Sequence, residues 1–173
     1  MITEQDYSAA EEQYISLTDD ELGQLARKAA EAQPALFAYI ANYYDSLVED
    51  DSKDFYIQLV YSTWIAYNNK YILKSILDIE EIEKMDEMEG KRLNDLYENE
   101  EAILHEVLRR MTEHPQVQLL GSVYTRIGDF YGEEQLADEN AENPSYQDAG
   151  IISGVINSFI NLLEKIRQVI YLS

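Results

Sequence analysis

Cysteine is absent from this chain of 173 residues. Its absence excludes a disulfide scaffold, a thiol nucleophile and any metal site that is built on thiolates. The sequence also contains no P-loop, no Gly-x-Ser-x-Gly and no Gly-x-Gly-x-x-Gly pattern, which are the short motifs of nucleotide binding and serine catalysis. We therefore favour a protein that is not an enzyme, and we expect no cofactor.

Long apolar runs are missing as well. The most apolar stretch, 151–172, is interrupted by Asn157, Asn161, Glu164, Lys165, Arg167 and Gln168. A membrane span needs roughly 20 predominantly apolar residues, and the N-terminus lacks the basic and apolar regions of a secretory signal. We expect a soluble, cytoplasmic protein that makes no membrane contact.

Basic residues are scarce, with 13 Lys and Arg against 34 Asp and Glu, which gives a formal net charge of −21. The densest basic groups are only pairs, such as Arg27-Lys28 and Arg109-Arg110. Binding to a phosphate backbone requires a basic patch. The composition therefore argues against a nucleic-acid partner and favours a basic protein partner.

The negative charge is concentrated in three stretches, 1–21, 78–101 and 129–148, and the first and third contain no Lys or Arg. Such clusters can be solvated helix faces that keep the protein soluble. They can also form an acidic docking surface. The sequence alone leaves both interpretations open.

Hydrophobic residues make up 46% of the chain, and they recur at the spacing of amphipathic helices. We predict an all-α fold, an antiparallel helical bundle or bundle-like array of five to seven helices. It forms a single domain over 1–173 with an acidic loop at 132–147. No segment alternates with period two for long enough to predict a strand.

Local patterns place several helix ends. Thr18 and Glu21 have the spacing of a capping box, and Pro34 either kinks a helix or begins a new one. A largely apolar helix is predicted over 53–77, a break near Gly90, and a last helix over 148–171. Glycines on helix faces are expected to permit close helix crossings; they are Gly121, Gly128, Gly150 and Gly154.

Tyrosine is abundant, with 14 residues. Two pairs, Tyr39 with Tyr43 and Tyr67 with Tyr71, have the i, i+4 spacing that places side chains on one helix face. They either pack in the core or line an aromatic interface. The predicted partner-binding residues are Tyr39, Tyr43, Tyr67, Tyr71, Glu133, Glu134, Asp138 and Glu139.

The favoured function is an acidic helical protein-binding module, similar in charge and size to inhibitors, immunity proteins or chaperones, that acts on a basic partner. One alternative is a self-associating structural protein, a homo-oligomer with the helix over 151–172 as its seam. Another is an all-helical Mg²⁺-dependent nucleotide hydrolase, for which Glu80 and Glu83 are the weak metal candidates. Acids at every third position drift around a helix rather than converge.

Overall fold

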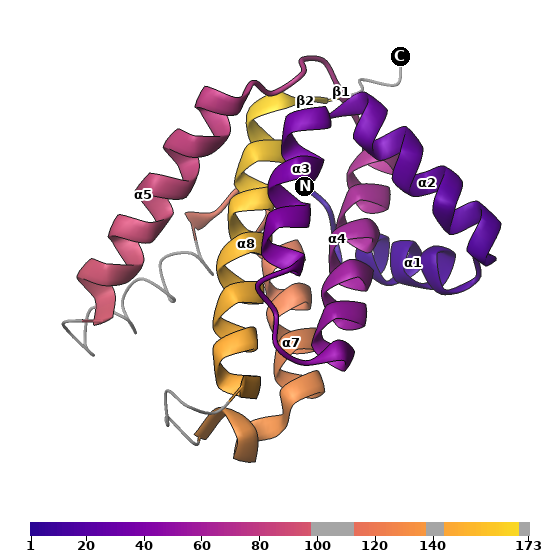
Figure 1. The fold of residues 1–173 in the computed structure, drawn as a ribbon. Helices are drawn as coiled ribbons and strands as arrows, with labels where there is room; N and C mark the ends of the chain where they lie inside the picture. Colours follow the sequence, from indigo (N-terminus) through magenta and orange to yellow (C-terminus); the bar gives the residue numbers. More distant parts are fainter. Residues whose placement is uncertain (98–112, 138–143, 170–173) are drawn as a thin grey trace.

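The computed structural model describes residues 1–97, 113–137 and 144–169. Within these ranges the chain forms seven helices and one small two-stranded sheet (Figure 1). The prediction of an all-α array of five to seven helices is confirmed. The elements are α1 (Glu4–Ile15), α2 (Asp19–Ala32), α3 (Pro34–Tyr44), α4 (Asp50–Lys70), β1 (Tyr71–Leu73), α5 (Ile79–Tyr97), α7 (Val117–Ala137), α8 (Pro144–Ile166) and β2 (Arg167–Val169).

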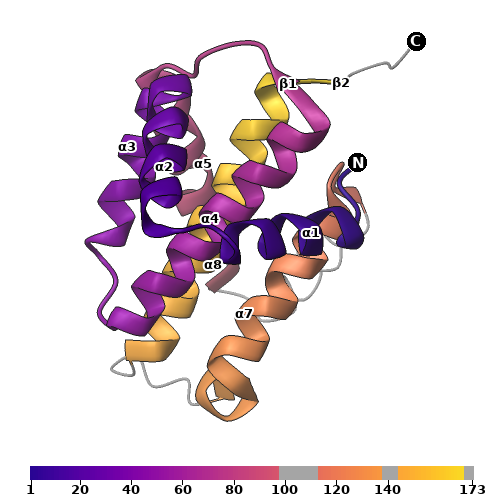
Figure 2. The same cartoon turned by 90° about the vertical axis from the view of Figure 1, so that its right-hand side faces the viewer.

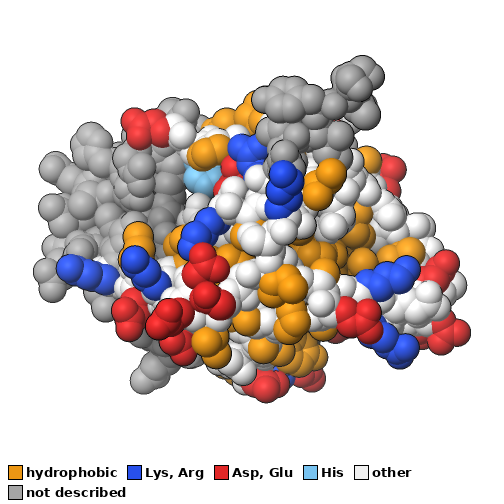
Figure 3. Space-filling view, turned by 90° about the horizontal axis from the view of Figure 1, so that it is seen from above, with side chains coloured by type: hydrophobic (Ala, Val, Ile, Leu, Met, Phe, Trp, Pro, Cys, Tyr) orange, Lys and Arg blue, Asp and Glu red, His pale blue; other side chains and the backbone are white. Residues whose placement is uncertain are grey.

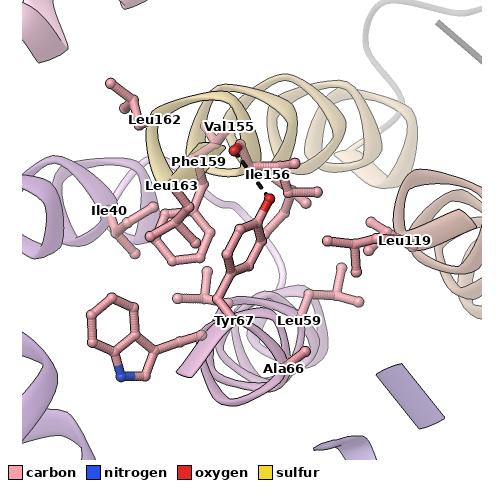
Figure 4. Packing of buried hydrophobic residues seen from close by; sticks show 14 of the residues in the cluster. Ile40, Leu59, Ala66, Tyr67, Leu119, Val155, Ile156, Phe159, Leu162 and Leu163 are labelled. Atoms are coloured by element: carbon pink, nitrogen blue, oxygen red, sulfur yellow. Dashed lines mark hydrogen bonds between the residues drawn. The ribbon is translucent and has the colours of Figure 1, made fainter. Parts of the chain in front are cut away.

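Helix α8 lies at the centre of the array, where it contacts α3, α4, α5 and α7. Helix α1 crosses the outside of α4 and also contacts α7 (Figure 2). The apolar stripe of α8 is buried and meets side chains of α4 and α7 in the core (Figure 4). Its buried members are Ile152, Val155, Ile156, Phe159, Leu163 and Ile166. Because this stripe is covered by the chain's own helices, it does not present the exposed seam that the self-association alternative requires.

The same helix contains a window, Gln147–Ile166, that is long and apolar enough by length and composition to cross a membrane. Of the described residues, no other helix meets these criteria, and 61% of the window is buried inside the protein. A core helix of a soluble protein passes the same test. The central, largely buried position of α8 therefore explains the high hydropathy of this helix.

Capping residues fix where the first helices begin. The Thr18 side chain accepts from the Glu21 backbone, and the Glu21 carboxylate accepts from the Thr18 N–H, so the predicted capping box is confirmed. Thr3 and Asp6 form a second capping box at the start of α1. Pro34 is the first residue of α3, where its missing N–H costs nothing. It therefore begins a new helix rather than kinking an existing one.

Two predicted helices end earlier than expected. Helix α4 ends at Lys70 rather than at 77, and α8 ends at Ile166 rather than at 171. The residues that follow form β1 and β2, which pair antiparallel with Tyr71 opposite Val169. A three-residue strand is too short to show a period-two pattern, so the residue pattern does not predict these strands.

Two further predictions are corrected between Ile79 and Pro144. Helix α5 continues through Gly90 to Tyr97 without the predicted break. The acidic loop predicted at 132–147 is wrong at both of its ends, because the backbone is helical over 133–137 and again from Pro144. Gly132, with φ of 72°, interrupts α7. Residues 138–143 lie outside the described part of the chain.

Three of the four helix-face glycines do not mark close helix crossings. A Cβ atom built at Gly121, Gly128 or Gly150 meets no atom within 4 Å. The prediction of close helix approach is wrong at these three positions. A glycine in a helix interior without such a packing role costs stability, because it adds conformational freedom to the unfolded chain.

Two alanine substitutions in α7 are therefore expected to have opposite effects. Gly128→Ala should raise the free energy of unfolding by about 0.5–1 kcal/mol, since the space is open and the backbone is helical. Gly132→Ala should lower it by about 1–3 kcal/mol, because its backbone conformation is nearly restricted to glycine. Urea unfolding, monitored by circular dichroism, measures both changes in the free energy of unfolding. Shifts of the same sign would contradict this description of α7.

Candidate binding surfaces

Two hollows in the protein surface are lined by tyrosine and acidic residues, the two residue types that the sequence predicts to bind a partner. The first lies between α3 and α5, and we call it the tyrosine groove. It has a volume of about 360 Å³. It is lined by Ala35, Ala38, Tyr39, Asn42, Tyr43, Ser46, Ile79, Ile82, Glu83 and Asp86.

Asp86 is the polar centre of the tyrosine groove. The hydroxyl groups of Tyr39 and Tyr43 both donate to its Oδ1 atom, at 2.8 and 2.9 Å. The two rings pack edge to face, with centroids 5.1 Å apart. The i, i+4 spacing thus places both tyrosines on one face of α3 as predicted, and α5 supplies the carboxylate that they share.

Both hydroxyl groups remain protonated donors at neutral pH. Burial raises the pKa of Tyr39 above its ordinary value, and the hydrogen bond to the Asp86 carboxylate raises it further. The same two causes, burial first, raise the pKa of Tyr43. The hydroxyls are neutral, so they orient the Asp86 carboxylate without cancelling its charge.

The second tyrosine pair, Tyr67 and Tyr71, lies elsewhere. Tyr67 is fully buried, and Tyr71 keeps only 4% of its surface exposed. Their rings pack against each other with centroids 5.6 Å apart. They belong to the core, and of the four predicted tyrosines only Tyr39 and Tyr43 reach a surface groove.

Tyr67 and Tyr71 are part of a buried polar network that we call the Glu164 hub, made of Tyr67, Tyr71, Gln116, Glu164 and Arg167. Glu164 Oε1 accepts from the Tyr67 hydroxyl at 2.9 Å and from Gln116 Nε2 at 2.7 Å. Glu164 Oε2 accepts from Arg167 Nε at 2.7 Å. Gln116 Nε2 also donates to the Tyr71 hydroxyl, while its Oε1 accepts from the Ile2 backbone. The hub joins α4, β1, α8, β2 and the residue just before α7 to the N-terminus.

The second hollow lies at the end of the array where α4 and α8 begin and α7 ends (Figures 1 and 2). We call it the acidic pole. Its volume is about 520 Å³, and its lining is Glu49, Asp50, Asp51, Phe130, Tyr131 and Ser145. Both Asp50 and Asp51 lie in the first turn of α4, where the helix dipole favours negative charge.

An aromatic ring is exposed among these acids. Phe130 keeps 41% of its surface accessible. Its ring stacks parallel to that of Phe55, with centroids 4.1 Å apart. The side chain of Asp148 is buried, and it accepts hydrogen bonds from the backbone N–H groups of Val48 and Glu49 at 2.9 and 3.0 Å. These contacts fix the turn that carries Glu49, Asp50 and Asp51.

Of the predicted acidic residues, Glu133 and Glu134 lie near the C-terminal end of α7, and Asp138 and Glu139 follow that helix in the sequence. The backbone of Glu133 and Glu134 is helical, but their side chains, and Asp138 and Glu139 altogether, lie outside the described residues. The C-terminal end of α7 and the start of α8 both lie at the acidic pole (Figure 1). Phe130 and Asp50 were not among the predicted site residues.

The opposite end of the molecule has a different surface. There Lys and Arg side chains lie among acidic ones around exposed hydrophobic side chains (Figure 3). Lys70, Lys74, Lys165 and Arg167 lie at or beside β1 and β2. Three of these pair with acids: Lys70 with Asp6, Lys165 with Glu81, and Arg167 with Glu164. Burial alone would raise the pKa of Asp6, but hydrogen bonds from Lys70 and Thr3 lower it to about 2.

The metal candidates do not converge. Over residues 1–97, 113–137 and 144–169, no group of three or more His, Asp or Glu side chains could hold a metal ion. Glu80 is exposed on α5, whereas Glu83 lines the tyrosine groove. Comparisons with known proteins give no further guide, since no family model, no curated protein and no solved structure matches this chain.

Proposed function

We propose that this protein is a non-enzymatic binding module that docks a basic protein partner on the acidic pole. The observation that carries the proposal is the combination of Glu49, Asp50 and Asp51 with the exposed ring of Phe130 in one hollow. Arginine, the residue type that both pairs with carboxylates and stacks on aromatic rings, suits such a surface.

Long-range electrostatics supports the same partner. A net charge of −21 creates a negative potential that attracts a basic protein and accelerates the encounter. The contact between such a pair weakens as salt screens it. An inhibitor, an immunity protein or a chaperone for a basic protein would use this surface in the same way.

The test measures affinity for a labelled arginine-rich peptide by fluorescence anisotropy at increasing salt. The double variant Asp50→Asn/Asp51→Asn should bind about 3- to 10-fold more weakly, because exposed ion pairs are worth about 0.2–1 kcal/mol each. Phe130→Ala should weaken binding by about 2- to 5-fold through loss of the ring contact.

A matched control separates the site from the net charge. Asp19 and Asp20 lie in the first turn of α2, as Asp50 and Asp51 do in α4. Asp19→Asn/Asp20→Asn therefore makes the same change of charge on a similar helix end. We expect less than a 2-fold effect in this control. Equal losses in both double variants, or binding that persists unchanged at high salt, would refute docking at the acidic pole.

A further inference from the structure

We propose that the tyrosine groove is a pocket for one arginine side chain of the partner. This inference rests on the proposed function, because it names the residue by which a basic partner is recognised. The guanidinium group would pair with Asp86, and the aliphatic stem would lie on the apolar walls of the groove. The acidic pole attracts the basic partner, and the tyrosine groove provides specificity by binding one of its arginine side chains.

The charge of Asp86 is the first argument. Its Oδ1 atom is held by two neutral hydroxyl groups, and no ion pair between described residues includes Asp86. The carboxylate is thus half-buried and held in orientation, and it has no ion-pair partner among the described residues. Its Oδ2 atom has no hydrogen-bond partner in the described part of the chain. A cation that supplies directed N–H donors would complete this site.

The walls of the groove are the second argument. Ala35, Ala38, Ile79 and Ile82 make them apolar, and Ile79 leaves 66% of its surface exposed to solvent. Long basic side chains cover apolar surface with their methylene stems while the charged head stays polar. The volume, about 360 Å³, is within the range of about 300–1,000 Å³ that is usual for ligand pockets.

The arrangement of acceptors favours arginine over lysine. Three further residues whose side chains contain oxygen acceptors line the groove together with Asp86, namely Asn42, Ser46 and Glu83. A planar guanidinium group presents five donors in a fixed fork and stacks on aromatic rings such as those of Tyr39 and Tyr43. An ammonium group is a compact point charge that cannot engage several acceptors in one plane.

The experiment uses the full-length protein, labelled for amide NMR, and short glycine peptides that each carry one test residue. The arginine peptide should shift the amide signals of Ala35, Ala38 and Ile82 in a saturable way. The lysine peptide should bind at least about 3-fold more weakly. A citrulline peptide, which has nearly the same shape without the charge, should bind about 10-fold more weakly, as expected when a charged hydrogen bond is lost.

Matched variants locate the effect. Asp86→Asn should weaken arginine-peptide binding at least about 5-fold, whereas Glu87→Gln, the same loss of charge at the next and exposed position of α5, should change it less than 2-fold. Ala38→Leu keeps Asp86 and fills the groove from an exposed helix position. It should also weaken binding, and it provides a second test if Asp86→Asn does not fold.

Three results would overturn this inference: equal binding of the arginine and citrulline peptides, equal effects of Asp86→Asn and Glu87→Gln, or a dimer in light scattering that Asp86→Asn converts to monomer. In the last case a second copy of this chain fills the groove. The proposed function is tested separately. If Asp50→Asn/Asp51→Asn still weakens the arginine-rich peptide, docking at the pole stands while the groove assignment falls.

Discussion

Phe159→Ala is expected to lower the free energy of unfolding by about 3–5 kcal/mol. Phe159 is fully buried on α8. Its ring meets that of Phe37 from α3 edge to face, with centroids 6.1 Å apart and an interplanar angle of 79°. Figure 4 places it in the buried cluster near Leu163 and Ile40. Truncation would leave a cavity where α3, α4 and α8 meet, and the surrounding helices can fill it only in part.

Urea unfolding monitored by circular dichroism measures this loss. Phe130→Ala serves as the control, because it also removes a phenylalanine ring, but from an exposed position at the acidic pole. We expect it to cost about 1 kcal/mol, mainly through the lost stacking with Phe55. If the two variants lost equal stability, the core would not be centred on α8.

Glu164→Leu is expected to destabilise the protein by a similar amount, about 3–5 kcal/mol. The side chain of Glu164 is only 12% exposed, and it accepts hydrogen bonds from Tyr67, Gln116 and Arg167. Leucine fills similar space but accepts none of them. The hydroxyl of Tyr67, the amide of Gln116 and the guanidinium of Arg167 would lose a partner in a poorly hydrated place.

Glu164→Gln distinguishes this network from simple packing. Glutamine keeps one acceptor oxygen for Tyr67 and Gln116 and loses the charge that pairs with Arg167. Its cost should be about 1.5–3 kcal/mol, the value of a hydrogen bond to a charged group. Thermal unfolding of both variants gives the ranking. A Leu variant as stable as the Gln variant would mean that the hub contributes through its volume alone.

Local sequence patterns predicted the elements best where a single residue controls the backbone. Thr18 with Glu21 and Pro34 each fix a helix start through their own hydrogen bonds or ring geometry. The strands β1 and β2 could not be predicted in this way. Each is only three residues long, and Tyr71 pairs with Val169 far along the chain.

The candidate site residues also differ in how well the sequence predicts their positions. The spacing of Tyr39 and Tyr43 placed both side chains on one helix face, but the identical spacing of Tyr67 and Tyr71 led to burial. Which pair faces solvent depends on how α4 and α8 pack, and residue spacing carries no information about that. Asp86 lies 43 positions after Tyr43, so only the folded arrangement of α3 and α5 brings them together.

The attachment of helix α1 has a consequence for the order of folding. Ile2 bonds to Gln116 at a separation of 114 positions, and the buried carboxylate of Glu11 accepts from Arg126 at a separation of 115. Closing such long loops costs entropy that only late contacts can offset. The contacts between α1 and α7 are thus expected to form late in folding. By the same argument their loss is an early step of unfolding, while the central helices remain packed.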